Sequence, residues 1–501
     1  MKKRYIFALM LALANQLPAF AKPLQVVGPL EVSSVDPEQN GYLFTRLQIA
    51  ETLVGVDSNG ELVPQLAEKW QVSSDGLTWT FFVRSHVKFH DNSEISPTIV
   101  KASLERALKG TGPITQAPIK QISTSDSALI IQLSRPFTPL PAMLANYTTQ
   151  ILATASYDDK NNVVAVIGSG PFKVSSLSMP LKVSMHRFDG YWQRKAAIDE
   201  VNYLAVGKGE TRALMAQSGE ADVVISLLPL SLNAVKRSPK TTVQTVTIPR
   251  TRMLKLNVAS PLFSDVRVRQ ALSEGIDRKA IAKAILRNEQ LAATQLFPPT
   301  ITQWHATSLT PLTTNVDSAK HLLQEAGWRL NKNGILEKDG KTFDATITTF
   351  STWPELPIIA TAIQAQWRAL GINASVSIGN SGDIVSKHKD GTLQVGLYSR
   401  NFALTPNPLG ALLTDFSPQG SGWGAMGWHN AQLNKNLETL ATIETASAPD
   451  LRKESITMLQ QALPVIPIAW SELSVATSKD LTNVSVDPLE LSYRLSEMQW
   501  K

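Results

Sequence analysis

The pattern of apolar and polar residues along the chain predicts a mixed α/β protein. Leu77–Phe89 is rich in Trp, Phe, Thr and Val, which are favoured in half-buried strands. Ser96-Pro97 supplies a capping side chain and a proline for a helix that ends near Leu108. Ile122–Leu133 is typical of a hairpin. Four further strands are expected at Phe172–Leu177, Leu181–Arg187, Val201–Val206 and Ala221–Ile225. This first half is therefore expected to be α+β.

Beyond Arg250 the pattern changes to strands that alternate with helices, which is typical of an α/β lobe. The expected strands are Met253–Val258, Phe343–Thr349, Ile372–Ile378, Leu393–Tyr398, Val465–Trp470 and Leu473–Thr477. The expected helices are 265–275, 277–287, 317–326, 357–370 and 430–442. Two compact lobes of roughly 200 residues or more are the natural partition. Proteins of this shape hold ligands in the crevice between their lobes.

The first 21 residues have the layout of a secretory signal peptide. Residues 2–4 are positively charged, Ile6–Ala14 is apolar, and small residues precede Lys22. A membrane anchor is the alternative, but a span needs about 20 apolar residues and this run is interrupted at Asn15. We expect cleavage near Ala21 and export to the periplasm.

Composition excludes several classes of protein. The 501 residues include 48 Lys and Arg and 42 Asp and Glu, a formal net charge of +6. No run of five or six like charges suggests an arm for nucleic acid, so no nucleic-acid partner is expected. The cysteine count is zero, which rules out disulfides, cysteine-ligated zinc and thiol catalysis.

Short catalytic motifs are also missing from the sequence. It contains no H-E-x-x-H, no G-x-S-x-G and no Walker-type phosphate loop. We therefore expect a protein that is not an enzyme. A secreted enzyme with a dispersed catalytic site stays open as an alternative, and a periplasmic chaperone with an exposed apolar patch is another.

Histidines supply few candidates for a metal site. His86 and His90 are four residues apart beside Asp91, but they flank the end of a predicted strand, where that spacing gives no assured shared face. The polarity of a turn is the preferred interpretation over a metal site. His429 lies beside the Gly-rich loop 419–427 and is the better metal candidate.

Arg400 is the main candidate for binding an anion. It follows the predicted strand Leu393–Tyr398 almost directly, and α/β lobes keep ligand groups at strand ends. Its guanidinium could bind a carboxylate through two parallel hydrogen bonds, with a structural ion pair as the alternative. Weaker candidates of the same kind are Arg46, Arg135, Arg250 and Arg252.

Two tryptophans are candidates for the walls of a cleft. Trp423 and Trp428 lie in or beside the Gly-rich loop, where a large ring has little local structure to pack against. Such rings either cap a core or line a cleft, and both interpretations stay open.

Several stretches together resemble the peptide/nickel family (family 5) of periplasmic solute-binding proteins of ABC importers. They follow one another in order over nearly the whole chain after the signal peptide. The matching stretches are Glu51–Trp70, Ser74–Phe81, Val87–Asp91, Gly168–Pro171, Tyr191-Trp192, Ser218–Asp222, Leu256-Asn257, Asp265–Ala271, Ile276–Arg278 and Ala319–Trp328.

The resemblance implies a two-lobed periplasmic-binding-protein fold with an extra subdomain and a ligand in the cleft. It implies a first lobe over 22–252, a second over 253–474 and a return to the first over 475–501, with hinge strands near 250 and 475. Such a protein has no intrinsic cofactor, catalyses no covalent chemistry and delivers its ligand to the membrane permease. A monomer is expected.

For the ligand, the resemblance favours a nickel or other metal–chelator complex, because Met253–Phe350 is more similar to the nickel-type branch. Peptide binders commonly pair an acidic residue with the peptide amine, whereas Ser399–Pro408 contains no carboxylate and has Asn407 at that position. A di- or oligopeptide ligand stays open as the alternative. The expected ligand-binding residues are Tyr42, Arg46, Arg400, Phe402, Trp423 and Trp428, with His429 as the candidate metal ligand.

Overall fold

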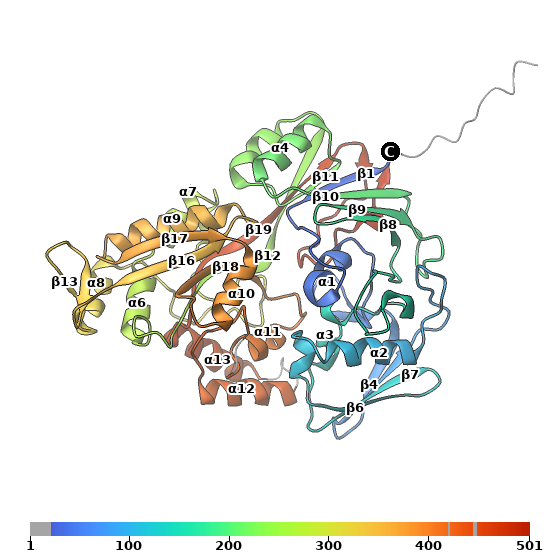
Figure 1. The fold of residues 1–501 in the computed structure, drawn as a ribbon, viewed down its shortest axis with the longest axis horizontal. Coiled ribbons are helices and arrows are strands. Elements are labelled where there is room, and N and C mark those ends of the chain that lie inside the picture. The colour runs from blue at the N-terminus through green and yellow to red at the C-terminus, as the bar shows by residue number, and fades with distance from the viewer. Residues whose placement is uncertain (1–21, 419–420, 444–447) are drawn as a thin grey trace, which may run out of the picture.

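The computed structural model describes residues 22–418, 421–443 and 448–501. Figure 1 shows two lobes side by side. The first lobe contains β1, β8–β11 and α1–α4, and the second contains β16–β18 and most of the helices that follow α5. The predicted signal peptide, residues 1–21, lies outside the described residues.

One sheet passes through both lobes. Within the described residues it has ten strands in the order β17-β16-β18-β12-β19-β11-β1-β10-β9-β8. These strands are β17 (Asn373–Gly379), β16 (Asp344–Phe350), β18 (Val395–Asn401), β12 (Thr241–Leu256), β19 (Val465–Ser478), β11 (Val223–Ile225), β1 (Leu24–Gly28), β10 (Glu200–Ala205), β9 (Lys182–Arg187) and β8 (Phe172–Ser178).

The strands β12 and β19 connect the lobes, and both are longer than the sequence predicts. Ser471 pairs with Ile248 and Glu472 with Thr247, so the two strands expected at 465–470 and 473–477 are one continuous strand. The prediction of a break there was wrong because two polar residues continue the ladder. The pairing of β12 with β19 changes register between Ile248 and Thr251 and again between Arg252 and Met253.

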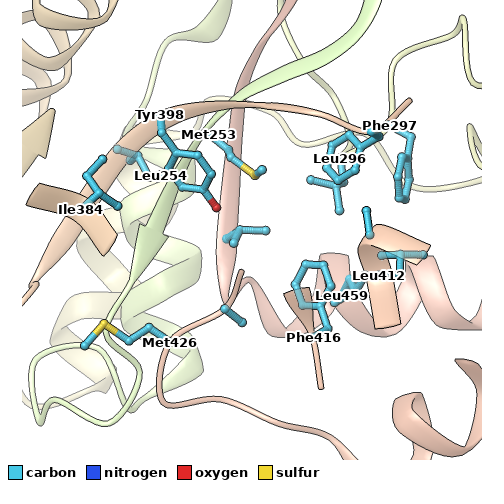
Figure 2. Close-up of a cluster of buried hydrophobic side chains, with 14 of the residues drawn as sticks. Met253, Leu254, Leu296, Phe297, Ile384, Tyr398, Leu412, Phe416, Met426 and Leu459 are labelled. Atoms are coloured by element: carbon cyan, nitrogen blue, oxygen red, sulfur yellow. The ribbon is translucent and has the colours of Figure 1, made fainter. Parts of the chain in front are cut away.

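The second lobe buries its core between the sheet and a set of helices. They are α6 (Val266–Glu274), α7 (Arg278–Ala284), α8 (Val316–Glu325), α9 (Glu355–Arg368), α10 (Ser381–Lys389), α11 (Pro408–Asp415), α12 (Ala431–Thr442) and α13 (Pro449–Ala462). A small antiparallel sheet is formed by β13 (Arg329–Leu330), β14 (Leu336–Lys338) and β15 (Lys341–Thr342). Figure 2 shows Met253 and Tyr398 from the sheet facing Phe416 and Leu459 from the helical side.

The extra subdomain is part of the first lobe. Its antiparallel sheet has the order β4-β5-β7-β6, built from β4 (Ala67–Val72), β5 (Thr78–Val83), β7 (Ala128–Leu133) and β6 (Ile119–Thr124), and β2 (Val54–Val56) pairs with β3 (Leu62–Pro64). Helix α2 (Pro97–Ala107) buries Val100, Leu104 and Ala107 on one face. The side chain of Ser96 accepts a hydrogen bond from the amide of Ile99 and Pro97 follows, as the sequence predicts.

The other helices of the first lobe are α1 (Pro37–Arg46), α3 (Leu140–Met143), α4 (Gly209–Ser218) and α5 (Leu232–Lys236). The sequence patterns did not predict α1, α3, α5, α10 or α11. The predicted extent of α7, to Arg287, is three residues longer than the helix, which ends at Ala284. The predicted cap of α6 is confirmed, because the Asp265 side chain accepts from the amide of Arg267 at 2.9 Å.

The C-terminal segment packs back on the first lobe. β20 (Leu481–Thr482) pairs with β21 (Gln499–Trp500), and the ring of Tyr493 stacks on Tyr203 of β10 at 6.5 Å between centroids. The predicted boundaries at 252 and 474 both fall within the long strands β12 and β19, and as domain limits they stay a prediction.

The two lobes touch across the cleft. The amide of Thr138 donates to the carbonyl of Ala441 at 2.8 Å, and Asn146 Nδ2 donates to the carbonyl of Leu404 at 2.8 Å. The lobes are therefore in contact at Thr138 and Asn146. None of the helices in the described part of the chain is long and apolar enough to cross a membrane.

Candidate functional site: the cleft between the lobes

Helix α1 brings Tyr42 and Arg46 to the cleft. Asp36 caps the helix by accepting from the amide of Glu38 at 3.0 Å, and Pro37 occupies its first turn. Residues four apart share a helix face, and the Arg46 guanidinium lies 5.6 Å from the centroid of the Tyr42 ring. This ring in turn meets Tyr147 edge to face at 5.7 Å. The result is a cation beside two aromatic rings.

These side chains line a space that we call the central cavity, with a volume of about 840 Å³ that includes open solvent. The first lobe contributes α1, Glu51 and Tyr147, the second lobe contributes Leu404, and the C-terminal segment contributes 490–492. The central cavity therefore lies where both lobes and the returning chain meet. Of the residues predicted from sequence, Tyr42 and Arg46 line it.

The guanidinium of Arg46 is only partly occupied. Arg46 is 6 % exposed, and its Nε donates to the carbonyl of Glu490 at 2.6 Å. Among the residues that the structure describes, neither of its Nη atoms donates a hydrogen bond. Burial raises the pKa of Tyr42 beside it, so that wall stays an uncharged phenol. Arg46 is thus a cation with donors available for a ligand.

Glu490 is the second charged group of the cleft, and sequence analysis missed it. Its Oε2 lies 2.6 Å from Arg250 Nη2 and accepts from Asn401 Nδ2 at 3.0 Å. Glu490 also lines two adjoining cavities of about 500 and 640 Å³. Arg250 stacks over Trp353 at 4.4 Å from the ring centroid. The pair joins the long strand β12 to the C-terminal segment.

Glu51 is a buried carboxyl group in the wall of the central cavity. Burial raises its pKa, an effect opposed by hydrogen bonds from Ser169, Trp192, Gln65 and Tyr191. The Ser169 hydroxyl donates to it at 2.7 Å and Trp192 Nε1 at 3.0 Å. This set of donors fixes Glu51 as part of the wall.

A second large space, which we call the outer cavity, extends from the same cleft. It measures about 1340 Å³ including open solvent, and it lies between Thr138–Ala142 of the first lobe and Phe402–Pro408 of the second. Phe402 lines it but is 1 % exposed and packs on Phe297 at 4.9 Å between ring centroids. Phe402 therefore serves the core of the second lobe as well as the cleft wall.

Arg400 forms an ion pair within the second lobe. Its Nε and Nη2 donate to the two oxygens of Asp415 at 2.8 and 2.9 Å. This is the structural pairing that the sequence left as the alternative for Arg400. Arg400 lines neither the central nor the outer cavity, and a role in ligand binding stays a prediction.

The two loop tryptophans are half-buried against the second lobe. Trp423 packs on Tyr398 at 5.5 Å, and Trp428 meets Phe416 edge to face at 6.3 Å. Lys255, whose pKa burial lowers to about 7, donates to the carbonyl of Gly422 at 2.7 Å. Neither tryptophan lines the central or outer cavity. Their described contacts are those of a cap on the core.

The metal candidates do not come together. His429 is exposed, and no three His, Cys, Asp or Glu side chains in the described part of the chain form a group that could hold a metal ion. His90 is buried rather than turned to solvent, with Nε2 2.9 Å from the carbonyl of Gly170. Burial lowers its pKa to about 4. His86 and His90 both lie in turns, as the preferred interpretation has it, but only His86 is exposed.

The remaining arginine candidates have different positions. Arg252 forms a buried ion pair with Glu355 at 2.6 Å, and Arg135 is exposed. Asn407 caps α11, since its side chain accepts from the amide of Leu409 at 2.9 Å. Arg252 and Asn407 therefore stabilise β12 and the start of α11, whereas Arg135 lies between β7 and α3 of the first lobe.

Two lobes on one sheet, joined by two long strands and enclosing a lined cleft, define a cleft-binding protein. The chain belongs to a family of this kind: the model of the bacterial extracellular solute-binding proteins, family 5 Middle, matches residues 61–423. This confirms the resemblance and the fold predicted from sequence.

Individual relatives match over most of their length. The chain is 26 % identical to the nickel-binding periplasmic protein of Escherichia coli (strain K12), over 97 % of this chain and 96 % of that protein. It is 27 % identical to the dipeptide-binding protein of the same strain, over 86 % and 84 %. The structure of NikA from Staphylococcus aureus in complex with Ni(L-His)2 superposes with a TM-score of 0.84 at 21 % identity, covering 96 % and 100 %.

The protein is accordingly the solute-binding component of an ABC importer. It acts in the periplasm or outside the cell, works with a permease and binds a small ligand or a peptide.

Proposed function

We propose that the central cavity captures a small carboxylate-bearing solute, with a nickel or other metal–chelator complex as the first candidate. The observation that carries the proposal is Arg46, a buried guanidinium whose Nε is bound while its Nη groups have no acceptor among the described residues. Such a group binds carboxylates through short charge-assisted hydrogen bonds. Tyr42 and Tyr147 supply flat walls for an organic chelator.

Similarity to relatives supports the metal in this proposal. A relative that matches 97 % of this chain is a nickel-binding protein. The metal is cargo in this scheme, and the protein has no resident cofactor. We propose that it acts as a monomer, releases its cargo chemically unchanged, and loses its signal peptide near Ala21 on export.

Capture is proposed to couple to closure of the lobes. The central cavity takes its lining from both lobes, so a ligand gains contacts from both only when they approach. A ligand with higher affinity for the closed state shifts the population toward it. The register shifts in β12 next to Arg250 are the proposed points of bending.

Short peptides are the second candidate. Consecutive residues of the chain line the two spaces, since Ala403 and Leu489 line the outer cavity and Leu404 and Glu490 line the central one. Together the two spaces offer room for a ligand longer than a compact chelate. A dipeptide-binding protein is among the relatives.

Native mass spectrometry with elemental analysis, on protein purified gently from its own periplasm, tests both candidates. A stoichiometric metal together with a small organic mass is the expected result and identifies the chelator. A ladder of peptide masses without metal would establish the second candidate instead. Conversion of any offered ligand during incubation would contradict the proposal that the protein only binds.

A further inference from the structure

The central cavity carries a negative charge as well as a positive one. Arg46 enters it from α1 and Glu490 from the C-terminal segment, and the same two residues line the adjoining cavity of about 500 Å³. The Glu490 side chain is 6 % exposed. A ligand held in this space therefore meets both charges in a setting where water screens them weakly.

The Glu490 carboxylate has one oxygen in use and one that is open. Arg250 and Asn401 both contact Oε2, at 2.6 and 3.0 Å. Oε1 accepts no hydrogen bond from any of the residues 22–418, 421–443 and 448–501. Oε1 is not among the buried side-chain atoms of the described residues that lack a partner, so it reaches open space. It is therefore available to accept a hydrogen bond from a ligand N–H group.

The backbone around Glu490 is held in place. Asp487 Oδ1 accepts from the amide of Leu489 at 2.9 Å, and Oδ2 from the amides of Leu491 at 2.8 Å and Ser492 at 2.9 Å. Glu490 itself has a φ of +61°, in the left-handed region that side-chain-bearing residues rarely adopt. Its carbonyl receives Arg46 Nε at 2.6 Å. Strain of this kind persists where the surroundings fix it, and it clusters at ligand sites.

We infer that Glu490 is a specificity-determining residue that selects solutes of amino-acid type. The ligand's carboxylate binds the Nη groups of Arg46, and its ammonium or metal-bound amine donates to Glu490 Oε1. The inference rests on the proposed capture of a carboxylate by Arg46. A ligand that has a carboxylate but no amine should bind weakly, because it brings negative charge close to Glu490 and offers Oε1 no hydrogen-bond donor.

Two pairs of probes test the inference by isothermal titration calorimetry. One pair is nickel(II) with L-histidine, which offers amine N–H groups, against nickel(II) with nitrilotriacetate, which has none. The other is L-alanyl-L-alanine against its N-acetyl derivative. The protein should bind the amine-bearing member of at least one pair tenfold or more tightly than its partner. In Glu490→Gln this preference should fall to threefold or less.

Glu472→Gln is the matched control, since Glu472 lines the 640 Å³ cavity but not the central one and should retain the preference. If Glu490→Gln does not fold, Glu490→Asp is the second variant to test. It keeps the negative charge but shortens the side chain by one methylene, so it should lose most of the preference for amine-bearing probes. If the protein binds both members of a probe pair with equal affinity, in every pair that binds at all, the role of Glu490 is overturned. The proposed capture of a carboxylate by Arg46 is then unaffected. Binding of none of the four probes would overturn the inference and the proposed function together.

Discussion

Arg400 and Asp415 form a two-point ion pair, with Nε to Oδ2 at 2.8 Å and Nη2 to Oδ1 at 2.9 Å. Asp415 is 2 % exposed and also accepts from the Ser421 hydroxyl at 2.8 Å. The pair joins the strand β18 to the end of α11 and to the loop that follows. An arginine that the sequence marks as a ligand group is thus tied to a buried carboxylate of its own lobe.

Removing this arginine should cost stability more than affinity. Arg400→Gln leaves Asp415 buried without its cation, which we expect to lower the free energy of unfolding by about 3 kcal/mol. Arg400→Gln with Asp415→Asn should recover part of the loss, because no charge is then left buried. Urea unfolding measures both. If Arg400→Gln has normal stability but binds nickel(II)–L-histidine or L-alanyl-L-alanine more weakly, Arg400 is a ligand-binding residue after all.

Arg46→Gln should reduce affinity for a carboxylate-bearing ligand. Loss of a charge-assisted hydrogen bond predicts a loss of about 2 kcal/mol, roughly thirtyfold in Kd. Calorimetry with the same two probes measures the change, and thermal unfolding checks that the variant is folded. Arg135→Gln removes an exposed arginine and should bind normally. An unchanged Kd in folded Arg46→Gln would contradict the assigned role.

Acid should destabilise the protein through His90. Burial holds the pKa of His90 near 4, against 6.5 for an exposed histidine, so the unfolded chain binds a proton that the folded one excludes. The free energy of unfolding therefore falls as pH drops from 6.5 to 4, by about 3 kcal/mol from this residue. Urea unfolding across this range should show a shallower pH dependence for His90→Gln. His86→Asn alters an exposed histidine and should follow the parent curve.

Phe402→Ala should create a cavity in the second lobe. Phe402 is 1 % exposed against Phe297, and truncation of a buried phenylalanine costs about 3–5 kcal/mol. Phe402→Leu should cost less because it fills more of the space. Val164→Ala changes a side chain that is 57 % exposed and should leave the midpoint of urea unfolding unaltered. Full stability of Phe402→Ala would show that the ring acts only as a cleft wall.

Local signals made much of the fold predictable. Capping residues such as Ser96 and Asp265 bind backbone amides only two or three positions further along the chain. The start of a helix can therefore be predicted from a short stretch of sequence. Helix α11 begins with a comparable signal at Asn407-Pro408, but the stretch was interpreted as a lining of the cleft. The first half of β12 was missed because its exposed residues contain no apolar run.

The cleft itself could be predicted only in part. Tyr42 and Arg46 share a helix face, but Glu490 reaches Arg46 from 444 positions away in the sequence. No spacing rule connects residues so far apart, and the contact depends on the returning C-terminal segment. The competing ion pair of Arg400 is likewise visible only once α11 is folded against β18.

The two long strands also determine how the molecule carries force. β12 and β19 pair antiparallel from Thr241 beside Ser478 to Lys255 beside Val465. The lobes are therefore connected by two strands that lie side by side. A pull that separates the lobes is carried along the covalent backbones of both strands, because the hydrogen bonds of an antiparallel ladder run perpendicular to the strands. Stretching the joint therefore means extending two backbones at once, whereas bending it needs only changes of backbone dihedral angles.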